Sequence, residues 1–241
     1  MSTEPCIALL LDGPMQSWGH ASRFERRTTA LHPTRSGVFG LIAAALGIDK
    51  HGSDEAARLA RFSAMKVTTI TLPRRHRRFG ELLIRRLEDY HTVTGIRRAS
   101  GKVDEDATVQ TYRHYHLDAR FGVLIEGSSA LLQEVADALR NPKWGVWLGR
   151  KSCPPASPVL AAPPGERAEA WRQLLQRAGY AGTEGMEQFD HVAEADPGSS
   201  GADMIEDTPL GYGLPIGERH APRWIRRVPK SAANPAPPEM D

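Results

Sequence analysis

The sequence has little of what disulfide or zinc stabilisation, membrane insertion or export requires. It contains only two cysteines, Cys6 and Cys153, too few for a disulfide framework or a four-cysteine zinc site. The longest apolar stretch, Val38 to Ile48, has 11 residues, whereas a membrane-spanning helix needs roughly 20. The N-terminus has no basic segment, and the apolar run Ile7 to Leu11 is too short for a signal peptide. We therefore expect a cytoplasmic protein that makes no membrane contact.

The chain also lacks the signatures of several enzyme classes. The phosphate-binding pattern Gly-x-x-x-x-Gly-Lys-Ser/Thr does not occur, and neither a Gly-x-Ser-x-Gly nucleophile elbow nor a Ser-His-Asp order stands out. His114 and His116 form a His-x-His pair, but without a nearby cysteine or spaced carboxylate this is weak metal-ligand spacing. The sequence therefore predicts no metal site, no cofactor and no catalytic residue.

What is present is an ordinary globular composition with an uneven charge. Of the 241 residues, 40% are apolar and 25% are charged. Residues 1–120 carry 19 Lys and Arg against 13 Asp and Glu, whereas the remaining residues carry 12 against 16. Six arginines fall close together: Arg74, Arg75, Arg77, Arg78, Arg85 and Arg86. Because arginine binds phosphate in a bidentate way, a polyanion is one candidate partner; a solvated surface hairpin is the other interpretation.

The apolar pattern predicts an α+β fold. Helices are expected after the caps at Thr34–Ser36 and Ser129, and strands at Ile7–Asp12, Met65–Leu72, Ala119–Glu126 and Trp144–Leu148. The resulting order, strand, helix, strand, strand, helix, strand, is typical of ferredoxin-like and RNA-recognition-type sheets. Residues 1–153 would form this domain. A basic insertion of about residues 73–113, broken by glycines, is expected to project from it as a long β-hairpin thumb.

A smaller C-terminal region is expected over residues 154–228. Five prolines between Pro154 and Pro164 predict a stiff connector. A helix at Glu166–Gly179, a loop at Thr183–Asp203 and a last strand at Trp224–Val228 would follow. Residues 229–241 are rich in proline and are expected to form a disordered tail.

Thr34, Arg35 and Ser36 stand where the first helix should begin. Free backbone N–H groups, two hydroxyls and a guanidinium would meet there, which is the chemistry of a phosphate site at a helix N-terminus. The alternative is a plain helix cap with a solvated arginine.

The loop from Gly13 to Gly19 presents a second candidate contact. It carries a thioether at Met15, an amide at Gln16 and an indole at Trp18. Exposed, these groups would stack on and hydrogen-bond to unpaired bases. Buried, Met15 and Trp18 would belong to the core.

Five short segments carry a more specific signal, and they lie at Leu11–Gly19, Pro33–Gly37, Asp89–Val93, Gln110–Arg113 and Leu148–Pro154. Taken in this order, they resemble the RAMP-family subunit of the type I-E CRISPR surveillance complex, Cascade. The resemblance covers about residues 6–155 and is weak beyond residue 160. It implies a modified RNA-recognition fold whose protruding thumb corresponds to the basic insertion.

The resemblance also implies a function and a set of partners. Such a subunit caps the 5′ end of the CRISPR RNA (crRNA), holds its repeat-derived handle, and contacts the adjacent backbone subunit and the large PAM-reading subunit, so that it meets target DNA only indirectly. A non-catalytic RNA-binding scaffold is the leading interpretation. A sister subtype uses its equivalent protein for cleavage, so a metal-independent endoribonuclease using His91, His114 or His116 is the alternative. An adaptor that binds only protein is a third.

Side-chain chemistry, rather than the resemblance, selects the candidate RNA contacts. They are the cationic, hydroxyl, aromatic and amide groups of the two loops, the thumb and the segment after residue 148: Met15, Gln16, Ser17, Trp18, Arg26, Arg27, Thr34, Arg35, Ser36, Arg74, Arg75, Arg77, Arg78, His91, Arg97, Arg98, Thr111, Tyr112, Arg113, Arg150 and Lys151.

Overall fold

The computed structural model describes residues 4–19, 25–97 and 101–231. Arg98 and residues 232–241 of the expected tail lie outside these ranges. The helices are α1 (Arg35–Leu46), α2 (Glu55–Ala60), α3 (Ser129–Arg140) and α4 (Arg167–Arg177), with 3-10 turns η1 (Met186–Gln188) and η2 (Ile216–Glu218). The strands are β1 (Cys6–Asp12), β2 (Met15–Gln16), β3 (Arg26–Arg27), β4 (Lys66–Thr71), β5 (Arg75–His76), β6 (Gly80–Glu81), β7 (Arg85–Arg97), β8 (Val103–Leu117), β9 (Arg120–Glu126), β10 (Leu160–Gly165), β11 (His191–Glu194), β12 (Ala202–Pro209) and β13 (His220–Val228).

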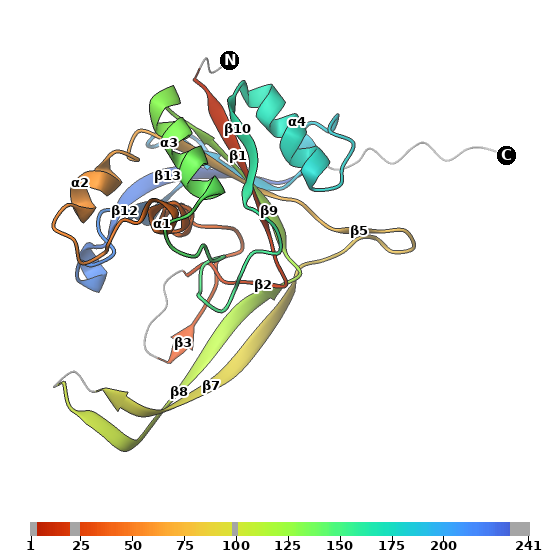
Figure 1. Cartoon of the computed structure of the whole chain (residues 1–241). Coiled ribbons are helices and arrows are strands. Elements are labelled where there is room, and N and C mark those ends of the chain that lie inside the picture. The colour runs from red at the N-terminus through yellow and green to blue at the C-terminus, as the bar shows by residue number, and fades with distance from the viewer. Residues whose placement is uncertain (1–3, 20–24, 98–100, 232–241) are drawn as a thin grey trace.

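The main sheet is antiparallel and has seven strands in the order β10-β1-β9-β4-β11-β13-β12. Its first four strands, together with α1 and α3, follow the βαββαβ order of a ferredoxin-like unit. Figure 1 shows α1 and α3 on one side of this sheet and α4 on the other. The predicted α+β class is therefore confirmed.

Strand β1 is the centre of the core because both of its faces are covered. Ile7, Leu9 and Leu11 belong to the apolar cluster beneath α1 and α3. The alternate residues, among them Ala8 and Leu10, belong to the cluster beneath α4. A strand buried on both faces is a continuous apolar run rather than an alternating one, as the sequence of β1 is.

The fourth strand of the ferredoxin-like unit is not where the sequence suggested. Residues 144–148 form no strand; β10 supplies it instead, within the segment expected to be a proline-rich connector. Among the described strands β10 pairs only with β1, so it is an edge strand. Proline lacks an N–H group to donate, and an edge strand tolerates this loss on its open side.

The C-terminal region continues the same sheet instead of forming a separate one. β11 pairs with β4, and β13 and β12 follow outward. The helix α4 and the last strand β13 agree with the sequence, although β13 begins earlier, at His220. The expected loop at Thr183–Asp203 is wrong in part, since β11 lies within it and β12 begins there. A strand of four residues held by partners distant in sequence gives no periodic signal.

The basic insertion forms two hairpins, not one. β5 and β6 form a short hairpin, and we call residues 74–83 the small hairpin. β7 and β8 make a long one, which we call the thumb, and β8 also pairs with β2 and β3 at its base. Figure 1 shows the two hairpins pointing in different directions. The clustered arginines at positions 74–86 are therefore divided between two surfaces.

Candidate nucleic-acid interface

A groove of about 660 Å³ opens where the thumb meets the core. It lies between the solvent side of α1, the loop after β2 and the segment 144–151. We call it the RNA groove. Its cationic and aromatic lining residues are Arg27, Lys50, Trp144, Trp147, Arg150 and Lys151, and Ser17, Trp18, Thr34, Ser36 and Gly37 also line it.

Glycines let three of the five sequence motifs meet beside this groove. The backbone N–H of Ser17 donates to the Leu148 carbonyl at 3.1 Å. Gly149 has φ +89°, and a Cβ there would lie 1.8 Å from the Ser17 carbonyl oxygen, so only glycine fits. A Cβ on Gly37 would lie 2.8 Å from the ring of Trp18. The motifs that contain these glycines are therefore parts of one packed unit.

The loop after β1 buries its side chains in the core, so Ser17 and Trp18 border the groove without an exposed surface. Trp18 is 0% exposed, and its indole N–H donates to Gln16 Oε1 at 3.2 Å. Gln16 in turn donates from Nε2 to the carbonyls of Leu11 and Ala119. Ser17 is buried, and Met15 is half-buried against the core. Contrary to expectation, this geometry leaves Trp18 no surface on which a base can stack.

Arg35 is also buried, with 3% of its surface exposed. Its guanidinium donates to the carbonyls of Phe62, Ser63 and Met65 and to Glu194 Oε1 at 2.5 Å. The caps expected of the helix are present, because Thr34 Oγ1 accepts from the Gly37 N–H at 3.2 Å.

The start of α1 already holds an anion. The Arg35 backbone N–H donates to Asp207 Oδ2 at 2.8 Å, and Arg223 donates to both oxygens of the same carboxylate. Burial lowers the pKa of Arg35, while the adjacent Glu194 opposes this shift. A carboxylate at a helix N-terminus provides the charge that a phosphate would provide. The expected phosphate site at Arg35 is thus occupied by the protein itself.

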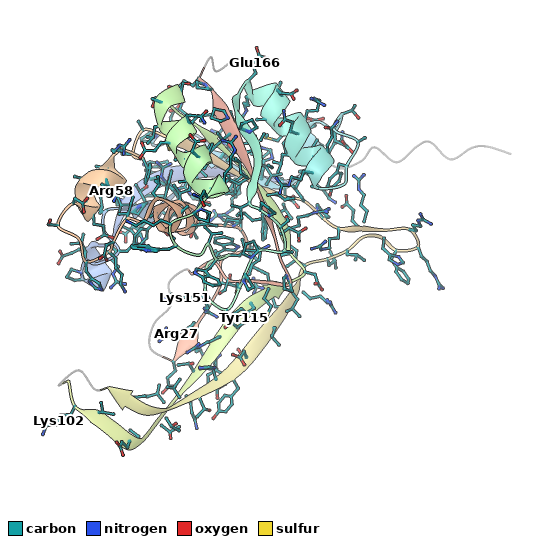
Figure 2. All side chains as sticks on the ribbon, viewed as in Figure 1. Arg27, Arg58, Lys102, Tyr115, Lys151 and Glu166 are labelled. Atoms are coloured by element: carbon teal, nitrogen blue, oxygen red, sulfur yellow. The ribbon has the colours of Figure 1, made fainter. Side chains whose placement is uncertain are left out.

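The cations that remain available lie on the groove side of the thumb base. Arg27 on β3 pairs in register with Arg113 on β8, so the two side chains lie on one face. Lys151 is exposed nearby, and Figure 2 shows Arg27, Lys151 and Tyr115 in the same region, where the thumb meets the core. Within the part of the chain that the structure describes, no carboxylate lies within 4.0 Å of these three cations, although Asp89 on β7 is opposite Arg113 in register; Arg113 Nε donates to Thr111 Oγ1.

Arg150 positions this group. It donates to the carbonyls of Arg27 at 2.7 Å and His114 at 3.2 Å, and its guanidinium lies 4.8 Å from the centre of the Tyr115 ring. These bonds fix the segment after Gly149 to the base of the thumb. Arg150 therefore serves both the fold and the positive potential of the groove.

The opposite face of the thumb has a different character. Arg26 lies 5.1 Å from the Tyr112 ring centre and 3.7 Å from Glu88. Tyr112 contacts Tyr90 with ring centres 5.4 Å apart, and Tyr90 is exposed. This face is aromatic, and its arginine is already paired with an acid. Arg97 ends β7, opposite Val103.

The three histidines of the thumb do not converge on one point. His91 pairs in register with Thr111, which is buried and donates to the His91 carbonyl. On the other face, His114 Nε2 lies 2.6 Å from Glu88. His116 is buried, its Nε2 is 2.6 Å from the Ala30 carbonyl, and burial lowers its pKa. His114 and His116 are thus each bonded to a different protein group, and His91 lies on the other face of the thumb.

The small hairpin has two kinds of arginine. Arg74 bonds to Asp12 and to the Asp118 carbonyl. Arg75 lies 4.5 Å from the Tyr180 ring centre and 3.9 Å from both Glu81 and Glu184. Arg77 and Arg78 are exposed, and no acid partner is found for either among the described residues. Only the latter two are free to meet a polyanion.

Two groove residues were missed by the sequence analysis. Trp144 is 43% exposed, and Trp147 is half-buried beside it in the groove lining. Both lie in the segment Trp144–Leu148, whose apolar run predicts a buried strand, and a tryptophan in such a strand would belong to the core. The signal that was available is the spacing Trp-x-x-Trp between Lys143 and Arg150, an aromatic pair within a basic segment.

The described residues contain no cluster of three or more His, Cys, Asp or Glu side chains that could hold a metal ion. Within the same ranges, no helix is long and apolar enough to cross a bilayer. Burial raises the pKa of the Cys6 thiol to about 12 and also raises that of Cys153, so neither thiol is a reactive thiolate.

Comparison with known proteins gives consistent matches over most of the chain. A family model described as "CRISPR-associated protein (Cas_Cas5)" matches residues 6–220. The CRISPR system Cascade subunit CasD of Escherichia coli (strain K12) is 35% identical over 157 residues, which are 64% of this chain and 69% of that protein. Among solved structures, a chain of a CRISPR RNA-guided surveillance complex has a TM-score of 0.69 and 28% identity, covering 93% of this chain and 90% of its own. A Cas protein crystal structure has a TM-score of 0.59 and 30% identity, covering 94% and 96%.

Proposed function

The chain belongs to the CRISPR-associated Cas5 family, and from this we propose that it is the non-catalytic RNA-binding subunit of a type I-E surveillance complex, Cascade. In this proposal the RNA groove and the base of the thumb hold the 5′ handle of the crRNA. One observation carries it: Arg27, Arg113 and Lys151 lie together at the thumb base with no carboxylate partner among the described residues, beside two accessible tryptophans.

This combination of groups suits single-stranded RNA. Cations that are not paired within the protein neutralise phosphates and release counterions. Tryptophan rings offer faces on which successive unpaired bases stack. Duplex RNA displays neither free base faces nor a backbone spaced for stacking, so a repeat-derived single strand fits the groove better. The pyrimidine or purine identity of the bases is not read by either kind of contact.

The two hairpins supply surfaces for neighbouring subunits. On the small hairpin Leu83 is 91% exposed and Phe79 is also exposed, and on the thumb Val93 and Val109 are exposed. Apolar groups gathered on projecting elements are typical of protein contacts. We assign the thumb to the backbone subunit and the apolar residues of the small hairpin to the large PAM-reading subunit, through which the chain meets target DNA only indirectly. Arg77 and Arg78 on the same hairpin are left for phosphates of the RNA backbone.

The endoribonuclease alternative has less support in the geometry. Cleavage through a 2′-hydroxyl requires a base, and a group that stabilises the phosphorane, on either side of one phosphate. His91 and His114 lie on opposite faces of the thumb, and His116 is buried with its ring against the Ala30 carbonyl. Only His91 shares a face with an unpaired cation, Arg113, and its Nδ1 lies 3.9 Å from Asp89; His114 and His116 are on the other face of β8.

The proposal is tested by handle-RNA binding of the full chain. The variant Arg27→Ala/Arg113→Ala/Lys151→Ala should bind synthetic handle RNA more weakly, and the slope of log affinity against log salt should fall by about 2, which is about 0.7 for each lost phosphate contact. Its melting temperature should change little, because the three cations have no ion-pair partner among the described residues and Thr111, to which Arg113 donates, still bonds to the His91 carbonyl. Arg226→Ala, an exposed arginine on β13, is the matched control and should change nothing.

A second measurement separates the scaffold from the nuclease. The purified chain is incubated with repeat RNA in EDTA, and the products are resolved on a gel. The scaffold predicts intact RNA. Specific cleavage that disappears in His91→Ala or His114→Ala would establish the nuclease instead, and a wild-type chain that protects no RNA at all would leave only a protein adaptor.

A further inference from the structure

The two edges of the main sheet differ in whether a further strand can pair with them. Strand β10 forms one edge and carries Pro163 and Pro164, which have no N–H group to donate to a neighbour. Strand β12 forms the other edge, and its proline, Pro209, is its last residue. Among the described residues β12 pairs with β13 alone, so the outward N–H and C=O groups along residues 203–206 are open.

The side chains along this open edge are also accessible. Met204 is 57% exposed, and Asp203 and Glu206 are exposed beside it. Proteins commonly protect an open edge with lysine or proline, and residues 203–206 contain neither. A second copy of β12 would bring further acids to an acidic edge, and like charges on adjacent strands destabilise their pairing. The edge therefore suits a strand of different composition.

A cavity of about 570 Å³ lies beside this edge. Its lining includes Ile205 of β12, Val192 of β11 and Thr69 of β4, which the strand register places on one face of the sheet. Thr69 is 3% exposed, and its Oγ1 has no hydrogen-bond partner within the described ranges, so the chain itself does not complete this cavity. A side chain opposite Ile205 on an added strand would project to the same face, next to the cavity.

Glu206 determines which charge the added strand should carry. It lines the cavity, is exposed, and has no ion-pair partner in the part of the chain that the structure describes. Asp203 and Asp207, in contrast, each bond to an arginine of β13. Residues 184–207 contain eight acids and no Lys or Arg. A cationic side chain would pair with Glu206, whereas a nucleic-acid phosphate would be repelled from this side of the molecule.

We propose that β12 receives one extended segment of a neighbouring protein subunit, which pairs with it as an added strand, places an apolar side chain in the cavity beside Ile205 and sets a lysine or arginine against Glu206. In this mode of recognition the backbone hydrogen bonds supply affinity, and the side-chain contacts supply specificity. The inference rests on the proposed place of the chain in a multisubunit complex. It adds a third protein-contact surface to the thumb and the small hairpin.

Hydrogen exchange tests the added strand. The full chain is measured alone and in the complex reconstituted from its own crRNA and partner subunits. Alternate backbone amides of residues 203–206 should exchange about tenfold more slowly, or slower still, in the complex, because new hydrogen bonds protect them. Residues 160–162 of β10 are the matched control and should keep their rates, since prolines follow them on that edge. Unchanged exchange at 203–206 in the assembled complex would overturn the inference.

Photo-crosslinking identifies the occupant in the same complex. Met204 is replaced by p-benzoylphenylalanine, and the crosslinked peptide is sequenced by mass spectrometry. It should be one segment of a partner subunit that contains a lysine or arginine. Glu206→Lys should lower the crosslink yield about threefold or more, whereas Glu134→Lys, at an exposed acid on α3, should not.

The remaining outcomes separate this inference from the proposed function. Crosslinks to crRNA or to a second copy of the chain, or no crosslink at all, would overturn the strand-docking edge while the assembled complex leaves the proposed function intact. A chain that does not enter the complex would overturn both.

Discussion

Two groups of arginines close to the start of α1 differ in what surrounds them. Arg35 and Arg223 are buried, and each bonds to a carboxylate, Glu194 or Asp207. Arg27 and Arg113 lie at the base of the thumb, where no acid pairs with either among the described residues. The first group joins α1 to the C-terminal strands, and the second is left for an anion from outside.

The same division applies to the aromatic residues. Trp18 is enclosed and bonded to Gln16, whereas Trp144 is open to the groove. Residue type and motif do not separate the two groups, since both tryptophans lie in basic, glycine-containing segments. The partners decide: a side chain whose bonds are satisfied inside the protein stabilises the fold, and one whose bonds are open is available to RNA.

The largest effect is expected from breaking the buried group. Arg35→Ala removes the guanidinium that donates to Glu194 and to the carbonyls of Phe62, Ser63 and Met65, although Arg223 stays bonded to both carboxylates. Leaving these buried acceptors without their donor should cost about 3–5 kcal/mol of unfolding free energy. For a chain of this size that is a fall in Tm of about 10 °C. Arg61→Ala, which removes an exposed ion pair with Glu134, should cost less than about 1 kcal/mol. A weakened RNA affinity with an unchanged Tm would return Arg35 to the role of phosphate ligand.

The tryptophans test the same contrast with a smaller effect. Trp18→Phe leaves Gln16 Oε1 unsatisfied in the core and should cost about 1–3 kcal/mol of stability, with no change in RNA affinity per folded molecule. Trp144→Ala should do the opposite, lowering handle affinity by about 1–3 kcal/mol at constant Tm. Calorimetry and fluorescence titration of both variants measure the two quantities. The comparison fails if both variants change the same quantity.

The small hairpin allows the comparison to be made within the five residues 74–78. Arg77→Ala/Arg78→Ala should lower the salt slope of RNA binding by up to about 1.4, since both side chains are free. Arg74→Ala/Arg75→Ala should leave the slope unchanged, because these side chains bond to Asp12 and pack on Tyr180. Equal slopes for the two variants would show that internal partners do not decide which arginines bind RNA.

The smallest effect concerns pH. Burial lowers the pKa of His116 in the folded state below its ordinary 6.5, so the unfolded chain binds this proton more readily. Stability should therefore be lost as the pH falls below about 6.5, and be unaffected by this group above it. His116→Asn should flatten the profile between pH 6.5 and 5 relative to the wild type in urea titrations. An unchanged profile would mean that His116 is not held neutral by its burial.

The sequence predicted the elements whose signal is local. The apolar runs of β1, β4 and β9 and the capped helices α1 and α3 were found, and with them the α+β class. β10 was missed because its prolines mimic a connector, and β11 because a four-residue strand has no period of its own. Their existence depends on pairing with β1 and β4, which lie far away in the chain.

The sequence motifs chosen for the candidate site do come together, but the surroundings of several of their residues could not be predicted. The motifs at 13–19, 33–37 and 148–154 do meet beside the groove. What could not be read is the carboxylate that caps α1, because Asp207 lies 172 residues from Arg35. Without that partner an arginine at a helix N-terminus has the pattern of a phosphate ligand, and Trp18 has the pattern of a stacking residue.

The C-terminal strands also determine when a newly made chain can fold. β1 pairs with β10 some 150 residues later, and the start of α1 is closed by side chains of β12 and β13. A nascent chain therefore cannot complete its core until residue 228 has left the ribosome, and such non-local pairing is slow. Until β11 has been made, the edge of β4 that pairs with it is open, and an unpaired strand edge is prone to aggregation. Chaperone demand during synthesis follows directly from this topology.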